Sequence, residues 1–512
     1  VLNGEENDLN VAPQSRQMLH LPIESTLAAL EQGHEVLLNV DFLLKEAECG
    51  YISKVMETGE RIAYAQLPVI EATPQAAELP HDKAKFSIKQ DKQGAITITG
   101  EGVEITFRGK TGFISDYIVN GIPMLCEGGS LRPNFWRAVT DNDMGAGLQQ
   151  KLKVWRNPVI ELTSMAVDRK ASSESQTTVR AIYDLPDVDA TLTLTYEIHR
   201  GGAMCVTQGI AFNDTTRDVP EMLRYGMVME MPRVMEVSHF YGRGPIENYA
   251  DRRYSQRLGI YRQTADEQFY PYIRPQETGT KGDIRWWLQT DTEGNGIKIT
   301  ADKPFYASAL HYDIATLDEG DEKHQRHPCD LVKLPYTILT LDSEHCGVGG
   351  IDSWGARPLD AYRLPAIDRT CTFTLTPVTT IDSIDIKGKR YPIPGWVDKE
   401  WETKMGNLID KLALEKFNER SLDKWELLMK HSDGCVSEYL VSAFSDILHK
   451  HPQEVLMSIY NHRVNPPTGI IDNIKFMAHE LGEDPSIDDL RQYITKLPDA
   501  SARDYLTQLF EL

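Results

Sequence analysis

Apolar and polar residues alternate along the middle of the chain, from about residue 84 to residue 378. In one such run, the apolar positions on one face are Leu192, Leu194, Tyr196 and Ile198, and threonines stand between them. This period of two is typical of β-strands with one buried face. Turn residues recur between the runs, and no helical periodicity intervenes. Roughly 300 residues of this texture predict one large antiparallel β-sandwich.

The residues before this region also contain strand-like runs, but only a few of them. One is HEVLLNVDFLL at 34–44, in a segment that extends over residues 1–75. A sandwich needs more strands than this segment offers. We therefore expect a partial β-domain, and we expect the chain to be a piece of a longer protein.

The hydrophobic period changes near the C-terminus. Apolar residues spaced as on one face of a helix are Val436, Tyr439, Leu440, Ala443, Phe444, Ile447 and Leu448, and again Leu490, Tyr493, Ile494 and Leu497. This spacing predicts amphipathic helices. Ser486 with Asp489, and Ser501 with Asp504, occupy positions typical of helix N-caps. We predict a linker at 379–399 and a bundle of short helices at 400–512.

Composition and charge narrow the classes of function. The 512 residues carry a formal net charge of −22, which argues against nucleic acid or an anionic membrane surface as a partner. No stretch approaches the roughly 18 consecutive apolar residues of a membrane span. The seven cysteines are scattered and odd in number, so they predict neither a disulfide framework nor a zinc site. The sequence does not assign a compartment.

Four loop-like stretches in the β region combine glycine, proline, amides, acids and aromatics. They are NFWRAVTDNDMGAG (134–147), YGRGPIENYADRR (241–253), YIRPQETGTKGDIRWW (272–287) and GVGGIDSWGARP (347–358). Such mixtures suit carbohydrate, because planar polar groups match hydroxyls and an aromatic ring matches the C–H face of a sugar. Trp354, on a short glycine-rich loop, fits that role. Its alternative is a core residue that closes the end of a sheet.

Each other polar cluster has a functional and a structural interpretation. Asp141, Asn142 and Asp143 suit a cation or sugar hydroxyls, or they cap their own backbone. The polar residues of 243–252 suit a buried network that shapes loops rather than catalysis. Glu322, His324 and His327 have metal-like spacing only on a helix, which their flanks disfavour. LEKFNER at 414–420 contains an Asn-Glu pair of the kind found in glycosidases, but we expect a solvated helical face there.

Taken in order, these loops resemble a known family. RAVTDND, GRGPIENYADR, RPQETG and GVGGIDSW look like the C-terminal small-chain region of family 2 glycoside hydrolase β-galactosidases, and together they span about residues 80–378. The segment 1–75 is similar to the second half of the immunoglobulin-like domain that precedes this region. The chain departs from the pattern at Val139, where proline is usual, and at Thr278, where asparagine is usual.

The resemblance implies a fold and a site. It implies a β-supersandwich related to galactose mutarotase for 80–378, preceded by a partial immunoglobulin-like domain and followed by the helices. It implies that Trp354 packs against the galactosyl unit of a β-galactoside held by a neighbouring (β/α)₈ barrel. It also implies that the loop with Arg137, Asp141, Asn142 and Asp143 borders the same pocket.

The resemblance also implies what the chain lacks. Retaining glycosidases use two carboxylates about 5–5.5 Å apart, and in the family both come from the barrel, for which the sequence contains no pattern. We therefore expect no catalytic residue, metal or cofactor in this chain. The resemblance allows a Mg²⁺ ion in the barrel, and it implies that the whole enzyme is a homo-oligomer. Alone, the chain is expected to be inactive.

Two other functions compete with this one. The chain suits a stand-alone sugar-binding or scaffold module, with the helical tail docking a partner. A mutarotase-like epimerase would need a histidine and a carboxylate that converge on a sugar ring. His239 is the histidine closest to such a role, but SHFYG is more typical of the end of a strand.

Overall fold

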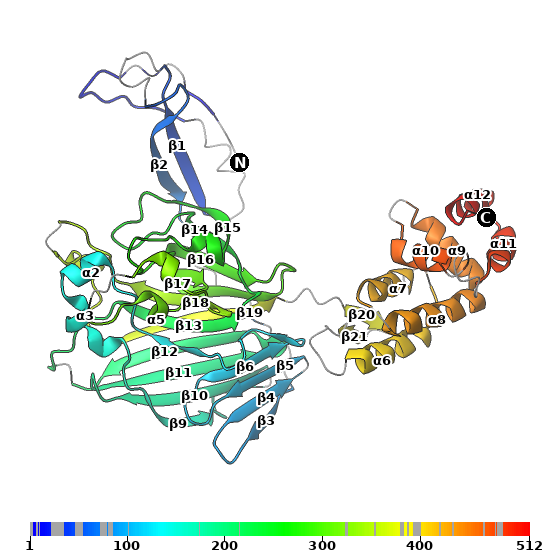
Figure 1. Cartoon of the computed structure of the whole chain (residues 1–512), viewed down its shortest axis with the longest axis horizontal. Coiled ribbons are helices and arrows are strands. Elements are labelled where there is room, and N and C mark those ends of the chain that lie inside the picture. Colours follow the sequence, from blue (N-terminus) through cyan, green and yellow to red (C-terminus); the bar gives the residue numbers. More distant parts are fainter. Residues whose placement is uncertain are drawn as a thin grey trace. The chain divides into compact units, whose positions relative to one another are not determined.

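The computed structural model (Figure 1) describes most of the chain, with gaps that include Ser353 and Trp354. The described residues are 4–6, 9, 11–21, 35–46, 55–71, 79, 85–100, 102–173, 175–214, 216–322, 326–352, 355–378, 383–386, 389–392, 401–418, 421–432, 435–463, 466–476, 478 and 485–511. The chain divides into two compact units, Val1–Ala77 with Arg257–Gly259, and Glu78–Gln256 with Ile260–Leu512.

The first unit contains an antiparallel pair of strands, β1 (Val36–Leu43) and β2 (Arg61–Ile70). Asp41 on β1 forms an ion pair with Arg257 at 2.6 Å. The side chain of Gln66 bonds both the N–H and the C=O of Leu258. The strand predicted at 34–44 is confirmed. That residues 1–75 are a partial immunoglobulin-like domain stays a prediction.

The second unit is dominated by antiparallel strands. Its strands are β3 (Ser87–Gln90), β4 (Ile96–Gly100), β5 (Val103–Phe107), β6 (Ile114–Val119), β7 (Ile122–Pro123), β8 (Leu131–Asn134), β9 (Glu161–Val167), β10 (Gln176–Leu185), β11 (Ala190–His199), β12 (Met204–Phe212), β13 (Arg224–Pro232), β14 (Val237–Gly244), β15 (Arg257–Thr264, of which the first three residues belong to the other unit), β16 (Lys281–Thr290), β17 (Gly296–Leu310), β18 (Tyr336–His345) and β19 (Arg369–Val378).

Short helices lie in the connections between these strands. They are α2 (Asp141–Gly145), α3 (Leu148–Lys151), η2 (Lys153–Trp155), η3 (Arg200–Gly202), α4 (Ala265–Gln268), α5 (Ile314–Leu317), η4 (Pro328–Asp330) and η5 (Asp360–Tyr362).

The long strand β17 joins two sheets into one closed system. Its first part, Gly296–Ala301, pairs with β19, and its last part, Tyr306–Leu310, pairs with β18. On one side the order continues from β19 through β12, β11 and β10 to β9, the broad sheet in Figure 1. On the other side β18 leads through β13 and β8 toward β3. The predicted large antiparallel β-fold is confirmed.

The core of this fold lies between the sheets, and the period-two pattern builds it. On β11 the side chains of Leu192, Leu194, Tyr196 and Ile198 are all completely buried, as the alternation predicts. Tyr196 packs edge-on against Phe107, with ring centroids 4.9 Å apart. Each such side chain contributes about 1.5–3 kcal/mol by leaving water. The threonines of the same strand face outward.

The C-terminal residues form helices around their own apolar core. The elements are β20 (Ser383–Ile386) and β21 (Lys389–Pro392), then α6 (Trp401–Ala413), α7 (Ser421–Lys430), α8 (Cys435–Lys450), α9 (Pro452–Asn461), α10 (Thr468–Lys475), α11 (Ile487–Thr495) and α12 (Ala500–Leu509). Leu440, Trp425 and Leu490 are among the completely buried residues of this core. The predicted helical tail is confirmed, although an antiparallel hairpin, β20–β21, lies in the segment predicted as a linker. The exact domain boundaries stay a prediction.

Two local predictions in the tail were only partly right. Ser486 caps α11 in a capping box with Asp489, as predicted. The cap of α12, however, is Asp499, whose carboxylate accepts from the N–H groups of two following residues, so the prediction of Ser501 was wrong. Residues 414–418 lie in the connection between α6 and α7, not on a helical face. Within the described residues, no helix combines the length and the apolar character that crossing a bilayer requires.

Candidate functional site

The loop predicted to border a sugar pocket forms the short helix α2. Thr140 caps this helix: its hydroxyl accepts from the N–H of Asp143 at 3.1 Å, and the Asp143 carboxylate accepts from the N–H of Thr140 at 3.0 Å. The interpretation that the Asp-Asn-Asp stretch caps its own backbone is confirmed for Asp143. Asp141 and Asn142 are exposed, and only Asp143 of the three is buried.

Arg137 and Asp143 form a fully buried ion pair beneath the glycine loop, which we define as residues 346–358. The guanidinium donates through Nε to Asp143 Oδ2 at 3.0 Å and through Nη2 to Oδ1 at 2.8 Å. It also donates to the backbone oxygens of Cys346 at 2.6 Å and Gly347 at 2.9 Å. The two side chains are 0% and 1% exposed. This geometry fixes the start of the glycine loop, because the ion pair is itself immobilised.

Two further side chains hold the next residues of the loop. Asn142 donates from Nδ2 to the backbone oxygen of Val348 at 3.0 Å. The Asp251 carboxylate accepts from the N–H groups of Val348 and Gly349, at 2.9 and 2.8 Å. A methyl group at Gly347 would lie 2.5 Å from the Asp251 carboxylate, so this close approach requires glycine. The sequence interpretation of Asp251 as part of a loop-shaping network is confirmed.

The loop is anchored again after Trp354. Gly355 has a φ of +85°, and a Cβ there would lie 2.4 Å from the backbone oxygen of Gly145 on α2, so a larger residue does not fit. Arg357 and Arg363 both form ion pairs with Glu221. Ser353 and Trp354 themselves lie outside the described residues. Described residues on both sides of Trp354 are therefore held by contacts with the rest of the domain.

The exposed edge of the site is formed by Asp141 and its partners. Its carboxylate accepts from Arg274 Nε at 2.9 Å and from Gln276 Nε2 at 3.2 Å, while 52% of the Asp141 side chain stays exposed. Arg274 also donates to the backbone oxygen of Val139 at 2.9 Å. The loops 134–147, 272–287 and 347–358 thus contact one another around α2. The fourth loop, 241–253, contacts the glycine loop through Asp251.

A second buried charged group lies in the strands nearby, and the sequence analysis missed most of it. Arg224 pairs with Glu277 at 2.5 Å and with Asp342 at 3.3 Å. Burial raises the pKa of Asp342 to about 7, with Glu277 adding to the rise and Arg224 opposing it. Burial and the two arginines lower the pKa of His345 well below its usual range. His345 therefore stays neutral between Arg137 and Arg224.

One signal of this group was present in the sequence. Asp342 interrupts the apolar alternation of TILTLDSEH and is completely buried within β18. A charged residue at a buried position in a strand needs a charged partner. The identity of that partner was hidden, because Arg224 is far away along the chain.

The remaining described candidates supply none of the contacts above, although His327 Nδ1 lies 3.3 Å from the backbone oxygen of Ile273. His239 lies within β14, as the strand interpretation predicted, and burial with nearby Arg262 lowers its pKa. His324 lies outside the described residues, so the disfavoured metal interpretation of Glu322, His324 and His327 is untested. Among the described residues, the side chains of Glu197, His199 and Cys205 bring possible metal-ligand atoms within 4.8 Å of one another.

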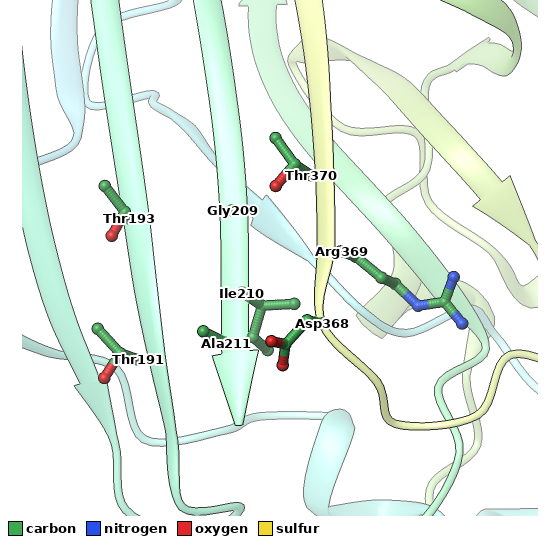
Figure 2. A pocket seen from close by; sticks show the side chains of 8 residues that line it. All are labelled: Thr191, Thr193, Gly209, Ile210, Ala211, Asp368, Arg369 and Thr370. Atoms are coloured by element: carbon green, nitrogen blue, oxygen red, sulfur yellow. The ribbon is translucent and has the colours of Figure 1, made fainter. Parts of the chain in front are cut away.

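A hollow of about 330 Å³ lies on the outer face of the broad sheet (Figure 2). It exists because Gly209 on β12 has no side chain between Thr193 on β11 and Thr370 on β19, its partners in register. Asp368 accepts from the N–H of Phe212 at 2.9 Å at one end. No charged side chain buried like Arg137 supports this hollow in the part of the chain that the structure describes.

Several solved structures share a distant likeness with the chain. One of them is a galactose 1-epimerase from Lactobacillus acidophilus, with a TM-score of 0.32, 8% identity, and coverage of 59% of this chain and 99% of that one. A putative aldose 1-epimerase from Escherichia coli K12 has a TM-score of 0.31, 10% identity, and coverage of 57% and 99%. Likenesses of this size do not identify a function.

Curated relatives are closer. A β-galactosidase of Priestia megaterium is 32% identical over 324 residues, which cover 62% of this chain and 30% of the relative. A β-galactosidase of Lactobacillus delbrueckii subsp. bulgaricus is 34% identical over 236 residues, 45% of this chain and 22% of the relative. The chain thus spans less than a third of the length of these relatives. The family described as beta galactosidase small chain matches residues 99–376, more than half of the chain and all four loops of the site. The chain belongs to the beta galactosidase small chain family.

Proposed function

We propose that this chain is the C-terminal region of a family 2 β-galactosidase, an enzyme that hydrolyses terminal β-galactose residues. The observation that carries the proposal is the glycine loop, fastened from below by Arg137, Asn142 and Asp251 inside the domain that the family matches. A loop held this firmly is suited to present one side chain at a fixed position. In the proposal that side chain is Trp354.

The proposal assigns different tasks to the predicted site residues. Trp354 forms one wall of the galactosyl pocket, and the exposed Asp141 and Asn142 border it. Arg137 and Asp143 are fully buried and bonded to each other and to the loop. We therefore propose them as positioning residues and not as groups that touch the sugar.

The reacting carboxylates belong, in this proposal, to a (β/α)₈ barrel supplied by a larger region or chain. Any Mg²⁺ ion is placed in that barrel, and no cofactor is assigned to this chain. Homo-oligomer assembly of the whole enzyme stays a prediction. A stand-alone module without a hydrolase partner is the less favoured alternative, since the two relatives described above are β-galactosidases.

The first test uses the full-length enzyme that contains this chain. Trp354→Ala should raise KM for an aryl β-galactoside about tenfold and lower kcat less, because stacking contributes binding rather than proton transfer. Trp354→Phe should retain most of the affinity, since it keeps an aromatic face. An unchanged KM in Trp354→Ala would contradict the assignment.

The second test uses the 512-residue chain alone. It should not hydrolyse the aryl β-galactoside above the background rate, because the proposal places both carboxylates elsewhere. Hydrolysis by the chain that disappears when one of its own carboxylates is replaced, for example in Glu277→Gln, would refute this part of the proposal.

A further inference from the structure

A pocket of about 530 Å³ lies between the loop that follows β14 and the segment that leads from α4 into β16. This volume is within the range of about 300–1,000 Å³ that small-molecule sites occupy. Its walls combine aromatic rings, planar amides and a few charged groups. Neither the proposed role of Trp354 nor the glycine loop makes use of it.

Lys281, the first residue of β16, lines this pocket while its side chain is almost completely buried, at 1% exposure. Its ammonium group has three donors. Within the described part of the chain, Nζ donates to the backbone oxygen of Gly279 at 2.6 Å. Burial lowers the pKa of Lys281 to about 7, and nearby Glu247 opposes the decrease. A ligand oxygen would provide a further acceptor for this group.

Glu247 is the second buried charged residue of the pocket. Both of its carboxylate oxygens already accept hydrogen bonds from the protein. It accepts from the N–H of Gly279 at 2.8 Å, from Thr278 Oγ1 at 3.2 Å, from Arg252 at 2.9 Å and from the Tyr272 hydroxyl. Thr278, where the family pattern has asparagine, therefore helps to fix the carboxylate. Glu247 serves to hold the wall of the pocket in place.

The aromatic part of the wall is fixed by the same contacts. Tyr270 and Tyr272 lie with ring centroids 4.7 Å apart and planes inclined at 57°. Thr278 Oγ1 bonds the backbone of Tyr270, which holds the start of the segment. Tyr270 is nevertheless 58% exposed, so an apolar surface remains open on a rigid support. Such a ring matches the C–H face of a pyranose.

The charges of the pocket nearly cancel. Arg252 is paired with Glu247, and Glu267 caps the backbone of Thr264. The positive charge available to an anion is therefore that of Lys281, and the nearby Glu247 carboxylate partly offsets it. A neutral ligand with hydroxyl groups and one apolar face suits this arrangement better.

We propose that this pocket is a binding site for a neutral pyranoside, in which the sugar stacks on Tyr270 and a sugar oxygen accepts a hydrogen bond from Lys281. This site adds to the proposed function and does not depend on Trp354.

The test is ligand-observed NMR on the 512-residue chain, with galactose, lactose and glucose as probes. At least one of them should bind saturably, with a Kd on the order of millimolar, as expected for one stacked sugar and few hydrogen bonds. Tyr270→Ala should weaken binding about fivefold or more. This ring is exposed, so the variant should fold, which its thermal midpoint will show.

Three controls decide between explanations. Tyr254→Ala removes another exposed tyrosine, 75% exposed and outside the pocket wall, and should leave the Kd within about twofold. Lys281→Met should abolish binding. Trp354→Ala should leave binding unchanged, which separates this pocket from the glycine loop.

Several outcomes would overturn the proposal. They are the absence of saturable binding by all three sugars, an unchanged Kd in Tyr270→Ala, loss of binding in Trp354→Ala, or displacement of the sugar by inorganic phosphate. The proposed function would survive such a failure, because it is tested by the kinetics of Trp354 variants in the full-length enzyme.

Discussion

The support of the glycine loop and the hollow on the outer sheet face are both built with polar residues, but they use them in opposite ways. Under the loop, Arg137 and Asp143 are completely buried and bond backbone atoms. On the outer face, Thr207 and Thr372 bond each other across two strands at 2.9 Å while partly exposed. The first arrangement holds a loop in one position. The second provides hydrogen-bond partners for hydroxyl groups on a sheet surface, where water can provide them as well.

This difference bears on where function is to be sought. Burying charged groups costs several kcal/mol unless geometry and partners compensate. The chain buries charged groups under the glycine loop, where Arg137 and Asp143 lie. It does not do so around the hollow, among the residues that the structure describes. The polar residue type alone does not distinguish the two places, but burial and bonding partners do. Variants in the two regions should therefore differ strongly in effect.

Arg137→Met should have the largest effect. It leaves the Asp143 carboxylate buried without its counter-charge, which costs about 3–5 kcal/mol of unfolding free energy. Calorimetric unfolding of the 512-residue chain measures this loss. Arg180→Met is the matched control, because its ion pair with Asp168 is 3.8 Å long and largely exposed, and its loss should cost less than about 1 kcal/mol.

The double variant Arg137→Met with Asp143→Leu sharpens this prediction. Removing both charges should recover much of the loss, because no buried charge is then left uncompensated. Equal stability of Arg137→Met and the parent would show that the buried pair does not support the loop.

Asp342→Asn should have the next largest effect, and it should depend on pH. The fold raises the pKa of Asp342 to about 7 from an ordinary value near 4, so between these values the folded state holds a proton that the unfolded state has lost. The stability of the parent therefore falls as pH rises through this window. Asparagine carries no such charge, so the variant should match the parent near pH 4 and exceed it near pH 8 by on the order of 2 kcal/mol.

Unfolding free energies of both proteins at the two pH values measure the effect. The other titrating groups contribute nearly equally to both and cancel in the difference. A stability gap that stays constant across this range would mean that Asp342 is ionised in the fold throughout, held so by Arg224.

The sequence predicted the strands and helices well, but it predicted poorly which distant side chains contact one another. Alternation on β11 and helical spacing on α8 are local patterns, and local backbone preference with burial is enough to read them. The burial of Arg137 arises from contacts with residues 346 and 347, about two hundred positions away, which no local pattern encodes. The prediction of the α12 cap was wrong for a local reason. Asp and Ser are both good N-cap residues, and which of Asp499 and Ser501 caps the helix depends on the backbone conformation just before it.

Asn142→Ala should have a smaller, local effect. It removes one hydrogen bond to the backbone oxygen of Val348, worth about 1 kcal/mol. Global stability should hardly change, but amide exchange at Val348 and Gly349 should quicken about fivefold as the loop opens more often. Asn213→Ala, which removes a surface contact with Asp189, should leave these amides unchanged. Equal exchange in both variants would show that Asp251 holds these two amides without a contribution from Asn142.

The smallest effect is expected at the hollow of Figure 2, and there it should be neutral or favourable. A Cβ at Gly209 would lie 3.6 Å from Thr370 Oγ1, an ordinary contact, and we expect Gly209→Val to fill part of the hollow. Valine also suits a strand better than glycine, so we expect a gain of up to about 1 kcal/mol in unfolding free energy. Gly347→Ala is the counterpart under the loop, where the added methyl would lie 2.5 Å from the Asp251 carboxylate and should cost about 1–3 kcal/mol. If thermal unfolding shows similar losses for both variants, the outer face is as closely fitted as the loop support, and the contrast between the two regions fails.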